Sequence, residues 1–398
     1  MSKDAKNVPA LRFKGYSDAW EKRKLGEVLL ERNSRSGAKQ LLSVTIKQGV
    51  IKAEDSGRKD NSSSDLSNYK LVKVGDIPYN SMRMWQGASG YSYFEGIVSP
   101  AYTVLIPSTE TDGLFLSYDI KRNKMLSVFQ RHSQGLTSDT WNLKYPQLSS
   151  IHVRVPKKNE QIQIRQALTK LDALIAATQH SIDALEQAKK ALLQRLFDQS
   201  WRFKGYSDPW EKRKLGEVVE RVTRKNRDLV STRPLTISAQ DGLVDQRKFF
   251  SKTVASKNIS NYFLLKAGDF AYNKSYSVGY PWGAVKRLDK YPSGVLSTLY
   301  IVFKPKKINS QFLVTYFEGT TWYVSVSKVA SEGARNHGLL NISASDFFDQ
   351  QLFFPTKKTE QESIGLTIKV LDDLIAATQS RLSSLELLKK ALLQDLFI

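Results

Sequence analysis

The sequence predicts an α+β fold in which two similar globular domains are separated by a long antiparallel two-helix coiled coil, with a pseudo-two-fold relation between the halves. Three observations lead to this prediction. One half of the chain repeats the other, each half ends in a long heptad pattern, and strand-like segments precede each heptad pattern. We expect a first domain at residues 1–155, a central spacer helix at 156–200, a second domain at 201–354 and a C-terminal spacer helix at 355–398.

The chain is a tandem duplication. The segment RFKGYSDAWEKRKLGEV from Arg12 returns from Arg202 with one substitution. A weaker match in the middle joins YKLVKVGDIPYN from Tyr69 to YFLLKAGDFAYN from Tyr262, and the ends match closely again in KKALLQRLF and KKALLQDLF. Uniform drift after an old duplication is the alternative, but it would not spare the edges of each half. We therefore expect one fold with a shared task at the edges and two different surfaces in the middle.

Each half ends in an amphipathic helix. Apolar residues recur in alternating steps of four and three from Ile164 to Leu196 and in the same register from Ile364 to Leu396. Two matched seams in one chain most simply pack on each other as a coiled coil, while separate helices lying on their own domains are the alternative. The predicted pairing residues are Leu168, Leu171, Ile175, Ile182, Leu185, Ile368, Leu371, Ile375, Leu382 and Leu385.

The links between segments predict the direction of the helices. Pro156 and Pro355 mark the two helix starts, and a helix of nearly forty residues is roughly 55 to 60 Å long. The first helix leaves the first domain after Pro156 and reaches the second domain near Asp198. The second helix starts beside the second domain, so it must run back to pack on the first. We therefore expect an antiparallel pair.

The composition favours a polyanion as partner. Lys and Arg number 60 against 39 Asp and Glu, for a formal charge of +21 in 398 residues. A basic protein without a nucleic-acid role is the alternative. The chain has no cysteine, no run of eighteen apolar residues and no apolar signal segment at its start. We therefore expect a cytoplasmic protein that is neither secreted nor bound to a membrane.

Polar loops between the strand-like segments are the candidate DNA-reading surfaces. Strands are predicted at LLSVTI, KLVKVGDIPYN, YTVLIP and IHVRVP of the first domain. Arg can bond guanine in the major groove, Asn or Gln can bond adenine, and aromatic side chains supply apolar contact. For each candidate a base contact, a phosphate contact and an ordinary solvated loop all stay open. The candidates are Asn80, Arg83, Trp85, Gln86, Arg131, Gln134, Asn273, Lys274, Tyr276, Arg335 and Asn336.

The repeated segment contains a Lys-Arg-Lys cluster close to a tryptophan in WEKRKLGEV. The cluster could clamp a phosphate. Its position before the first strand of each domain favours a structural role with a solvated basic face.

Motifs of catalysis are missing from the sequence. There is no GxxxxGK[ST] phosphate loop, no Asn/Asp-Pro-Pro-aromatic methyltransferase motif and no Pro-Asp…Glu-x-Lys nuclease signature. The four histidines are too scattered for a metal site. We therefore expect a binding module without catalysis, metal or cofactor.

The organisation resembles the specificity subunits of type I restriction-modification systems over essentially the whole chain. These have the order variable domain, shared helix, variable domain, shared helix. The Trp-Glu-x-x-x-Leu-Gly-Glu motifs from Trp20 and Trp210, the helix ending KKALLQ-x-LF and the strand ending GD-x-x-YN are similar to that family.

The resemblance implies a DNA-binding, non-catalytic subunit in which each target-recognition domain reads one half of a bipartite double-stranded DNA target. The expected partners are two modification (methyltransferase) subunits and two restriction (ATP-dependent translocase/nuclease) subunits, which would carry S-adenosylmethionine, ATP and Mg²⁺. The paired helices would be the docking platform and would set the length of the unspecified spacer.

Two other functions compete with this one. A non-specific DNA-bridging architectural protein would explain the charge and the duplication, but not the divergence of the two middles. An autonomous DNA enzyme would have to act on DNA without partners.

Overall fold

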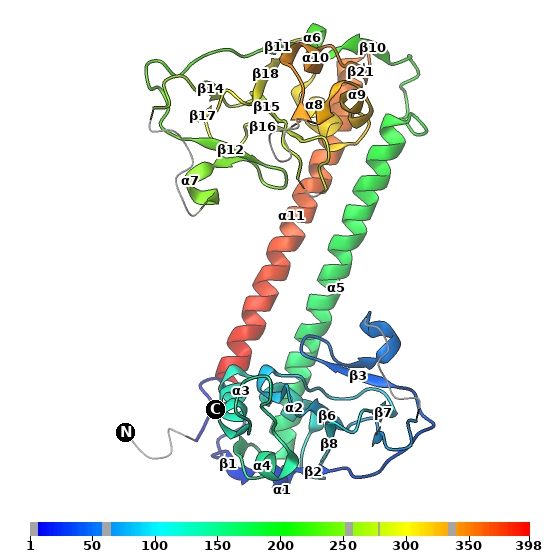
Figure 1. Ribbon diagram of the computed structural model, residues 1–398, viewed down its shortest axis with the longest axis vertical. Coiled ribbons are helices and arrows are strands. Elements are labelled where there is room, and N and C mark those ends of the chain that lie inside the picture. The colour runs from blue at the N-terminus through cyan, green and yellow to red at the C-terminus, as the bar shows by residue number, and fades with distance from the viewer. Residues whose placement is uncertain (1–6, 58–64, 251–257, 278, 333–339) are drawn as a thin grey trace. The chain divides into compact units, whose positions relative to one another are not determined.

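The computed structural model describes residues 7–57, 65–250, 258–277, 279–332 and 340–398. The chain divides into two compact units, each described here by itself. Unit 1 comprises Met1–Gln179 and Ser380–Ile398, and unit 2 comprises His180–Gln379. Each unit therefore contains one globular part and a segment of each long helix (Figure 1). Among the described residues, no helix combines the length and the apolar character needed to cross a membrane.

The globular part of unit 1 contains short strands and short helices and leads into the first long helix. Its elements are β1 (Glu21–Lys24), α1 (Leu25–Val28), β2 (Leu29–Glu31), β3 (Leu42–Thr45), β4 (Gly49–Lys52), the 3-10 helix η2 (Ala53–Ser56), β5 (Lys70–Val72), β6 (Ile77–Asn80), the 3-10 helix η3 (Met84–Gln86), β7 (Gly96–Val98), β8 (Tyr102–Pro107), α2 (Gly113–Asp119), α3 (Asn123–His132), α4 (Tyr145–Ser149), β9 (His152–Val155) and the long helix α5 (Lys158–Phe197).

The globular part of unit 2 repeats this order with a few additions and leads into the second long helix. Its elements are β10 (Glu211–Lys214), α6 (Leu215–Val218), β11 (Val219–Arg221), β12 (Leu235–Ser238), β13 (Gly242–Asp245), α7 (Gln246–Phe249), β14 (Phe263–Lys266), β15 (Phe270–Asn273), β16 (Ala284–Arg287), β17 (Ser293–Leu296), β18 (Ile301–Pro305), α8 (Ser310–Glu318), α9 (Tyr323–Val329), β19 (Ser331–Glu332), β20 (Leu340–Asn341), α10 (Ala344–Phe348), β21 (Gln351–Phe354) and the long helix α11 (Lys358–Asp395).

An antiparallel sheet forms the centre of each globular part. Its strand order is β2-β8-β6 in unit 1 and β11-β18-β15-β16 in unit 2. The register is also shared, because Ile77 lies opposite Leu105 in unit 1 and the corresponding Phe270 lies opposite Phe303 in unit 2. The pairs β1-β9, β3-β4 and β5-β7 likewise correspond to β10-β21, β12-β13 and β14-β17. The repeated sequence thus encodes one topology twice.

The Gly-Asp pair in KVGD makes a turn where the sequence predicted one continuous strand. Lys70 begins β5, and Gly75 then takes a left-handed conformation (φ 97°), which glycine adopts at little cost, before β6 begins. The buried Asp76 carboxylate accepts hydrogen bonds from the Lys73 backbone N–H at 2.7 Å and from Arg32 Nε at 2.6 Å. Unit 2 repeats this turn, with Asp269 bonded to Arg224 Nη2 at 2.6 Å. The motif therefore has a structural role.

The repeated segment is bonded to the first turn of each long helix. In unit 1, Arg12 donates two hydrogen bonds to the Glu160 carboxylate, at 2.7 and 2.8 Å, and the buried Trp20 indole donates a third at 3.4 Å. Glu160 is only 1 % exposed. A buried carboxylate is costly unless it is paired and hydrogen-bonded, so these three donors make its position favourable.

Unit 2 contains the same arrangement. Arg202 donates to Glu360 at 2.9 and 2.7 Å, and the Trp210 indole donates to it at 3.3 Å. WEKRKLGEV itself forms the first strand and a helical turn of each globular part, β1 with α1 and β10 with α6. Its predicted position before the first strand is therefore wrong. Its position is explained by these contacts.

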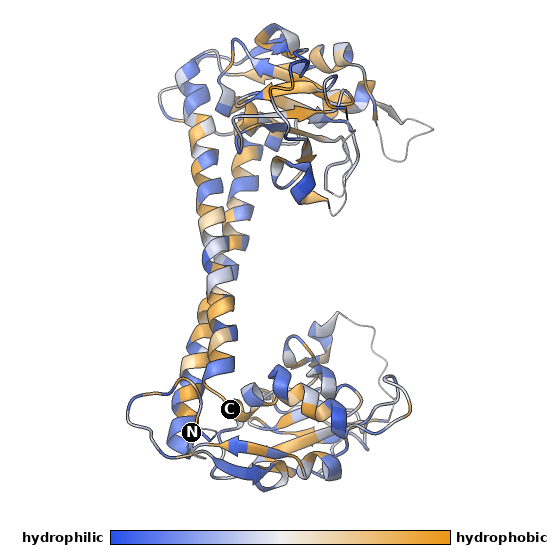
Figure 2. Ribbon diagram, turned by 90° about the vertical axis from the view of Figure 1, so that its left-hand side faces the viewer, coloured by the Kyte–Doolittle hydropathy of each residue, from blue (hydrophilic) through white to orange (hydrophobic). Residues whose placement is uncertain are grey.

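The two long helices bury the predicted heptad seam. Every seam position from Ile164 to Leu196 and from Ile364 to Leu396 is buried or half-buried, and most positions between them are exposed. Figure 2 shows hydrophobic residues recurring along both helices between hydrophilic ones. In unit 1 the end of α11 lies beside the start of α5, because Leu11 bonds the Asp395 carbonyl while the adjacent Arg12 bonds Glu160. The helix segments of unit 1 are therefore antiparallel.

The seam is interrupted by Lys189 and Lys389, and each lysine binds an aspartate of the other helix. In unit 1, Lys389 Nζ lies 2.6 Å from Asp172 Oδ1. In unit 2, Lys189 binds Asp372 and also lies 2.8 Å from Glu318 Oε2. The burial of Lys189 opposes its charge, but these carboxylates outweigh that effect and raise its pKa.

The same charges disfavour the opposite orientation. A parallel alignment of the two copies would match every apolar seam residue, but it would put Asp172 beside Asp372 and Lys189 beside Lys389. The ion pairs therefore favour the antiparallel orientation, which the apolar seam alone does not specify.

We expect reversal of one charge to destabilise unit 1 and reversal of both to recover part of that loss. Asp172→Lys places two ammonium groups together and also removes the acceptor of the Tyr118 hydroxyl, which lies 2.7 Å from Asp172 Oδ2. Because the pair is about one-third exposed, the expected loss is only about 1 kcal/mol. Urea unfolding of the single variant and of Asp172→Lys/Lys389→Asp measures it. Equal losses in the two variants would show that the two charges do not interact.

Candidate nucleic-acid interface

The segment after β6 carries the first group of candidate residues in unit 1. Met84 of η3 and Phe129 of α3 are buried in the same core, and α3 packs on η3, so the 3-10 helix is held on the globular part. Arg83 is exposed, and its Nη1 donates to Gln86 Oε1 at 3.1 Å, which keeps the two side chains together. An Arg–Gln pair of this kind presents several donors and one amide group on a firmly supported turn.

Trp85 is half-buried beside a second tryptophan. Its ring meets Trp141 edge to face with the centroids 5.1 Å apart, and its indole N–H donates to the Met82 carbonyl at 3.1 Å. The ring donor is therefore already used inside unit 1. What Trp85 can offer a ligand is apolar contact.

The structure brings Arg131 and Gln134 into the same part of unit 1. Arg131 lies in the last turn of α3 and is exposed, so it stands on a helix and not in the polar loop that was predicted for it. Gln134 follows the helix, and its backbone exchanges hydrogen bonds of 2.9 and 2.8 Å with Asn142, next to Trp141. Helix α3 packs on η3, so the two candidate segments form one surface.

Asn80 and its counterpart Asn273 have a structural task. Each ends a central strand, and its side-chain oxygen accepts a hydrogen bond from the backbone N–H two residues later, at 3.0 Å from Met82 and 3.1 Å from Ser275. Asparagine stabilises turns in this way. The side-chain oxygen is thus committed to the turn.

The candidate residues of unit 2 are divided by the structure. Lys274 is half-buried, and its ammonium group donates to the Ile342 carbonyl at 3.3 Å, so it points into the globular part. Tyr276 is 58 % exposed and accessible to a ligand. Arg335 and Asn336 lie outside the described residues.

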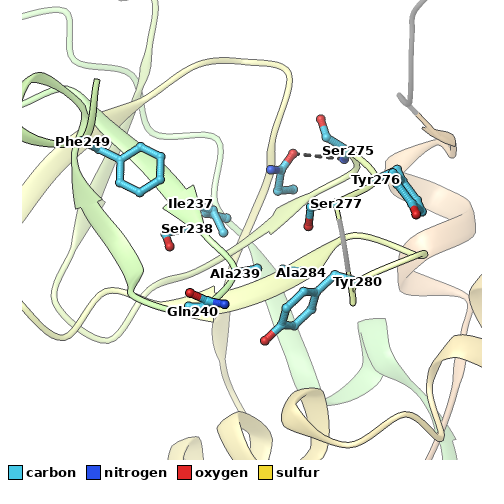
Figure 3. Close-up of a pocket in the computed structure, with 11 residues that line it drawn as sticks. Ile237, Ser238, Ala239, Gln240, Phe249, Ser275, Tyr276, Ser277, Tyr280 and Ala284 are labelled. Carbon is cyan, nitrogen blue, oxygen red and sulfur yellow. Dashed lines mark hydrogen bonds between the residues drawn. The ribbon is translucent and has the colours of Figure 1, made fainter. Parts of the chain in front are cut away.

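A pocket of about 310 Å³ opens beside Tyr276 in unit 2. It lies between the β12–β13 turn, the end of α7 and the segment that follows β15 (Figure 3). In that view Phe249 and Tyr276 stand at opposite ends of the pocket. Its lining includes Gln240, Phe249, Tyr276, Ser277 and Tyr280.

Exposed aromatic rings and an amide group give this pocket the chemistry of a base-contacting surface. Phe249 is 48 % exposed and Gln240 is exposed, so both can reach a ligand. Apolar contact and amide hydrogen bonds are both used to read base edges. Gln240, Phe249 and Tyr280 were not among the residues predicted from the sequence. The exposed pair of aromatic residues in QRKFF, beside two cations, was the signal that could have identified Phe249.

The equivalent place in unit 1 is closed. The β3–β4 turn approaches the segment after β6 so closely that a Cβ atom on Gly90 would lie 2.9 Å from the Gly49 Cα atom. Lys121 covers the same turn, with its ammonium group 3.4 Å from the Ile46 carbonyl, and burial lowers its pKa. The two units therefore present different surfaces on one framework.

The described residues contain no group of three His, Asp or Glu side chains arranged to hold a metal ion. The Lys-Arg-Lys clusters of β1 and β10 are exposed. In β1, Arg23 already bonds Glu21 at 2.8 Å.

Comparison with known proteins finds one matching family model and two similar curated proteins. The family model of the type I restriction modification DNA specificity domain matches residues 17–187. The type I restriction enzyme MjaVIII specificity subunit of Methanocaldococcus jannaschii is 24% identical over 357 residues, which is 81% of this chain and 78% of that protein. The putative MjaX specificity subunit of the same organism is 23% identical over 170 residues, 40% of this chain and 38% of that protein.

A solved structure shares the fold. The S subunit of the type I restriction-modification system of M. genitalium matches with a TM-score of 0.59 at 13% identity, covering 98% of this chain and 99% of that one. The sequence matches confirm the resemblance drawn from the residues, and the structural match confirms the fold class. Residues 17–187 therefore match a type I restriction modification DNA specificity domain, and the chain is similar over most of its length to a type I restriction enzyme specificity subunit.

Proposed function

We propose that each globular part, at about residues 1–155 and 201–354, reads one half of a bipartite double-stranded DNA target. The observation that supports this most is the different surface on the common framework: a closed turn at Gly49 and Gly90 in unit 1, and the open pocket beside Tyr276 in unit 2. Identical half-sites would need no such difference. A non-specific DNA-bridging protein, the alternative, would not need it either.

The chain acts in this proposal as a non-catalytic cytoplasmic subunit. Two modification subunits supply methyl transfer from S-adenosylmethionine, and two restriction subunits supply ATP- and Mg²⁺-dependent translocation and cleavage. The net charge of +21 supports direct contact of this chain with DNA phosphates. The loop candidates of unit 1, Arg83, Trp85, Gln86, Arg131 and Gln134, and Tyr276 of unit 2 are proposed to touch the DNA.

Exchange of the first globular part tests this proposal. Replacing residues 28–155 with the equivalent part of a relative should change one half-site and leave the other, because each globular part has a core of its own. The modified sites would be mapped by methylation-sensitive sequencing of cells that carry the whole system. A change in both half-sites would refute separate reading.

The pocket of unit 2 should contribute to the half-site that the exchange leaves unchanged. Tyr276→Ala together with Gln240→Ala removes the exposed ring and the amide, so we expect affinity for that target to fall about tenfold, or about 1.4 kcal/mol. Tyr276→Phe is the matched control, because it keeps the ring. Binding is measured on targets altered in one half at a time. A loss that is equal for altered and native half-sites would mean that the pocket does not read sequence.

The helices α5 and α11 are proposed to set the spacer between the half-sites, and the predicted seam residues to hold them together. Four residues inserted after Thr178 should lengthen α5 by about 6 Å, close to two base-pair steps. Since four residues exceed one helical turn, the insertion also adds a rotation of about 40°. The mapped sites should keep their half-sites and gain spacer length.

The control variant carries a matched insertion after Thr378 in addition to the one after Thr178. Because both helices are then lengthened equally, the inserted residues need not loop out of the helix pair. If both variants stay active with the parental spacer, the helices do not measure it.

A further inference from the structure

The loop that follows α3 in unit 1 presents an apolar side chain directly to solvent. Leu136 is 101 % exposed, whereas the next most exposed large apolar residue among those described, Leu387, is 68 % exposed. Isolated apolar residues are common on protein surfaces, so exposure alone assigns no task to Leu136. The construction of the loop and the surface on which it lies supply the rest of the argument.

This loop is closed at its base and anchored at both ends. Gln134 and Asn142 exchange backbone hydrogen bonds of 2.9 and 2.8 Å. Phe129, before the loop, is buried, and Leu143, after it, is also buried and accepts a hydrogen bond from the Tyr79 hydroxyl at 3.0 Å. The loop is therefore a fixed projection of the globular part.

Leu136 stands beside a tight turn of the loop. The Thr140 hydroxyl accepts from the Thr137 backbone N–H at 3.1 Å and donates to the Thr137 carbonyl at 3.0 Å. Gly135 has a φ of 145°, and a Cβ atom on it would lie 2.6 Å from the Thr140 carbonyl oxygen, so the turn requires glycine. Glycine also leaves one flank of Leu136 without a side chain. The loop thus presents one long apolar side chain among small polar residues.

The loop belongs to the surface that carries the DNA-reading candidates of unit 1. Trp141, at its base, meets Trp85 of η3 edge to face. The exposed Arg131 precedes the loop and the exposed Lys144 follows it, so cations that can bind phosphates lie on both sides in the sequence. Asp139 is the one carboxylate within the loop. An apolar projection between cations suits a nucleic acid better than an apolar protein surface.

We propose that Leu136 is a wedge that enters the base stack of the half-site read by unit 1 and fills the space left by the adenine that is turned out for methylation. The inference rests on the proposed function for the half-site and for methyl transfer by the modification subunit. Methyltransferases reach a base in a duplex only after it has left the stack. Leucine is among the side chains that proteins insert between base pairs.

Insertion explains the length and the exposure of this side chain. Contact with a thymine methyl group in the groove needs only a short apolar group, such as that of alanine or threonine. Turning a base out costs free energy, because its stacking and pairing are lost. An apolar side chain in the vacated space offsets part of that cost. Since Leu136 belongs to unit 1, its effect should be confined to one half-site.

Fluorescence of the full chain assembled with the modification subunit on the mapped target tests the wedge. The probe duplex carries 2-aminopurine, which brightens on leaving the stack, in place of the adenine methylated in the unit 1 half-site. With Leu136→Ala we expect the fluorescence increase to fall at least about fivefold, and methylation of the unsubstituted target at this adenine to slow about tenfold. Leu136→Met keeps a long apolar side chain and should retain both signals.

The chain offers a matched control in Val74→Ala. Val74 is 61 % exposed in the turn before β6, whereas η3 follows the other end of that strand. Unit 2 has Ala267 at the corresponding position, so the same turn tolerates alanine. This variant should leave fluorescence and methylation at native levels. Methylation of the unit 2 half-site should be unchanged in every variant, and circular dichroism melting should show native folding of all of them.

A mismatch opposite the adenine separates insertion from other contacts. Because a mismatched base leaves the stack more readily, the mismatch should bring methylation by Leu136→Ala to within about threefold of the native rate. A loss that the mismatch does not relieve would assign Leu136 to a groove contact, and equal losses in both half-sites would assign it to contact with another subunit. Either result, or native fluorescence with Leu136→Ala, would overturn the inference. A native complex that methylates neither half-site would instead refute the proposed function.

Discussion

A carboxylate buried at the start of each long helix joins three parts of the molecule. Glu160 and Glu360 are 1 and 2 % exposed, and each accepts its hydrogen bonds from the arginine and tryptophan of the repeated segment. An unpaired carboxylate there would be strongly destabilising. The helix, the repeated segment and the globular part can therefore take their native positions only together.

The residue that follows each of these glutamates extends the connection into the globular part. Gln161 accepts from the Asp112 backbone N–H at 2.8 Å, and Gln361 accepts from Asn309 at 2.8 Å. Asp112 and Asn309 are the N-caps of α2 and α8. A change in the direction of a long helix would thus be transmitted to these caps, and the loops beyond the central strands rest on a firmly held base. Surface loops on such a base can change without loss of the fold, which suits a protein whose binding specificity varies.

Some features were predictable from the sequence because they rest on repetition or period. The duplication and the seam of α5 and α11 needed only the printed order of residues. The short helices α2, α3 and α4 were missed, because in segments of five to ten residues an apolar pattern does not separate helix from loop. Arg131 was consequently assigned to a connection when it lies on α3.

The pocket beside Tyr276 could not have been predicted either, since Phe249 and Gln240 reach it from segments that are distant in sequence. Lys274 shows the opposite error. A lysine in a polar loop looks available to DNA, yet its ammonium group bonds the Ile342 carbonyl. Tertiary contacts of this kind leave no local pattern.

The exchange of helix ends between the two units has a consequence for the order of folding during synthesis. Phe397 stacks on Phe115, with the ring centroids 5.1 Å apart, and completes the core of unit 1, whereas Phe197 fills the corresponding place in unit 2. All of unit 2 leaves the ribosome before Phe397 does. Unit 2 can therefore finish folding first, while unit 1, although translated earlier, keeps an open apolar site on its core. During that interval unit 1 exposes apolar surface of the kind that chaperones bind and that favours aggregation.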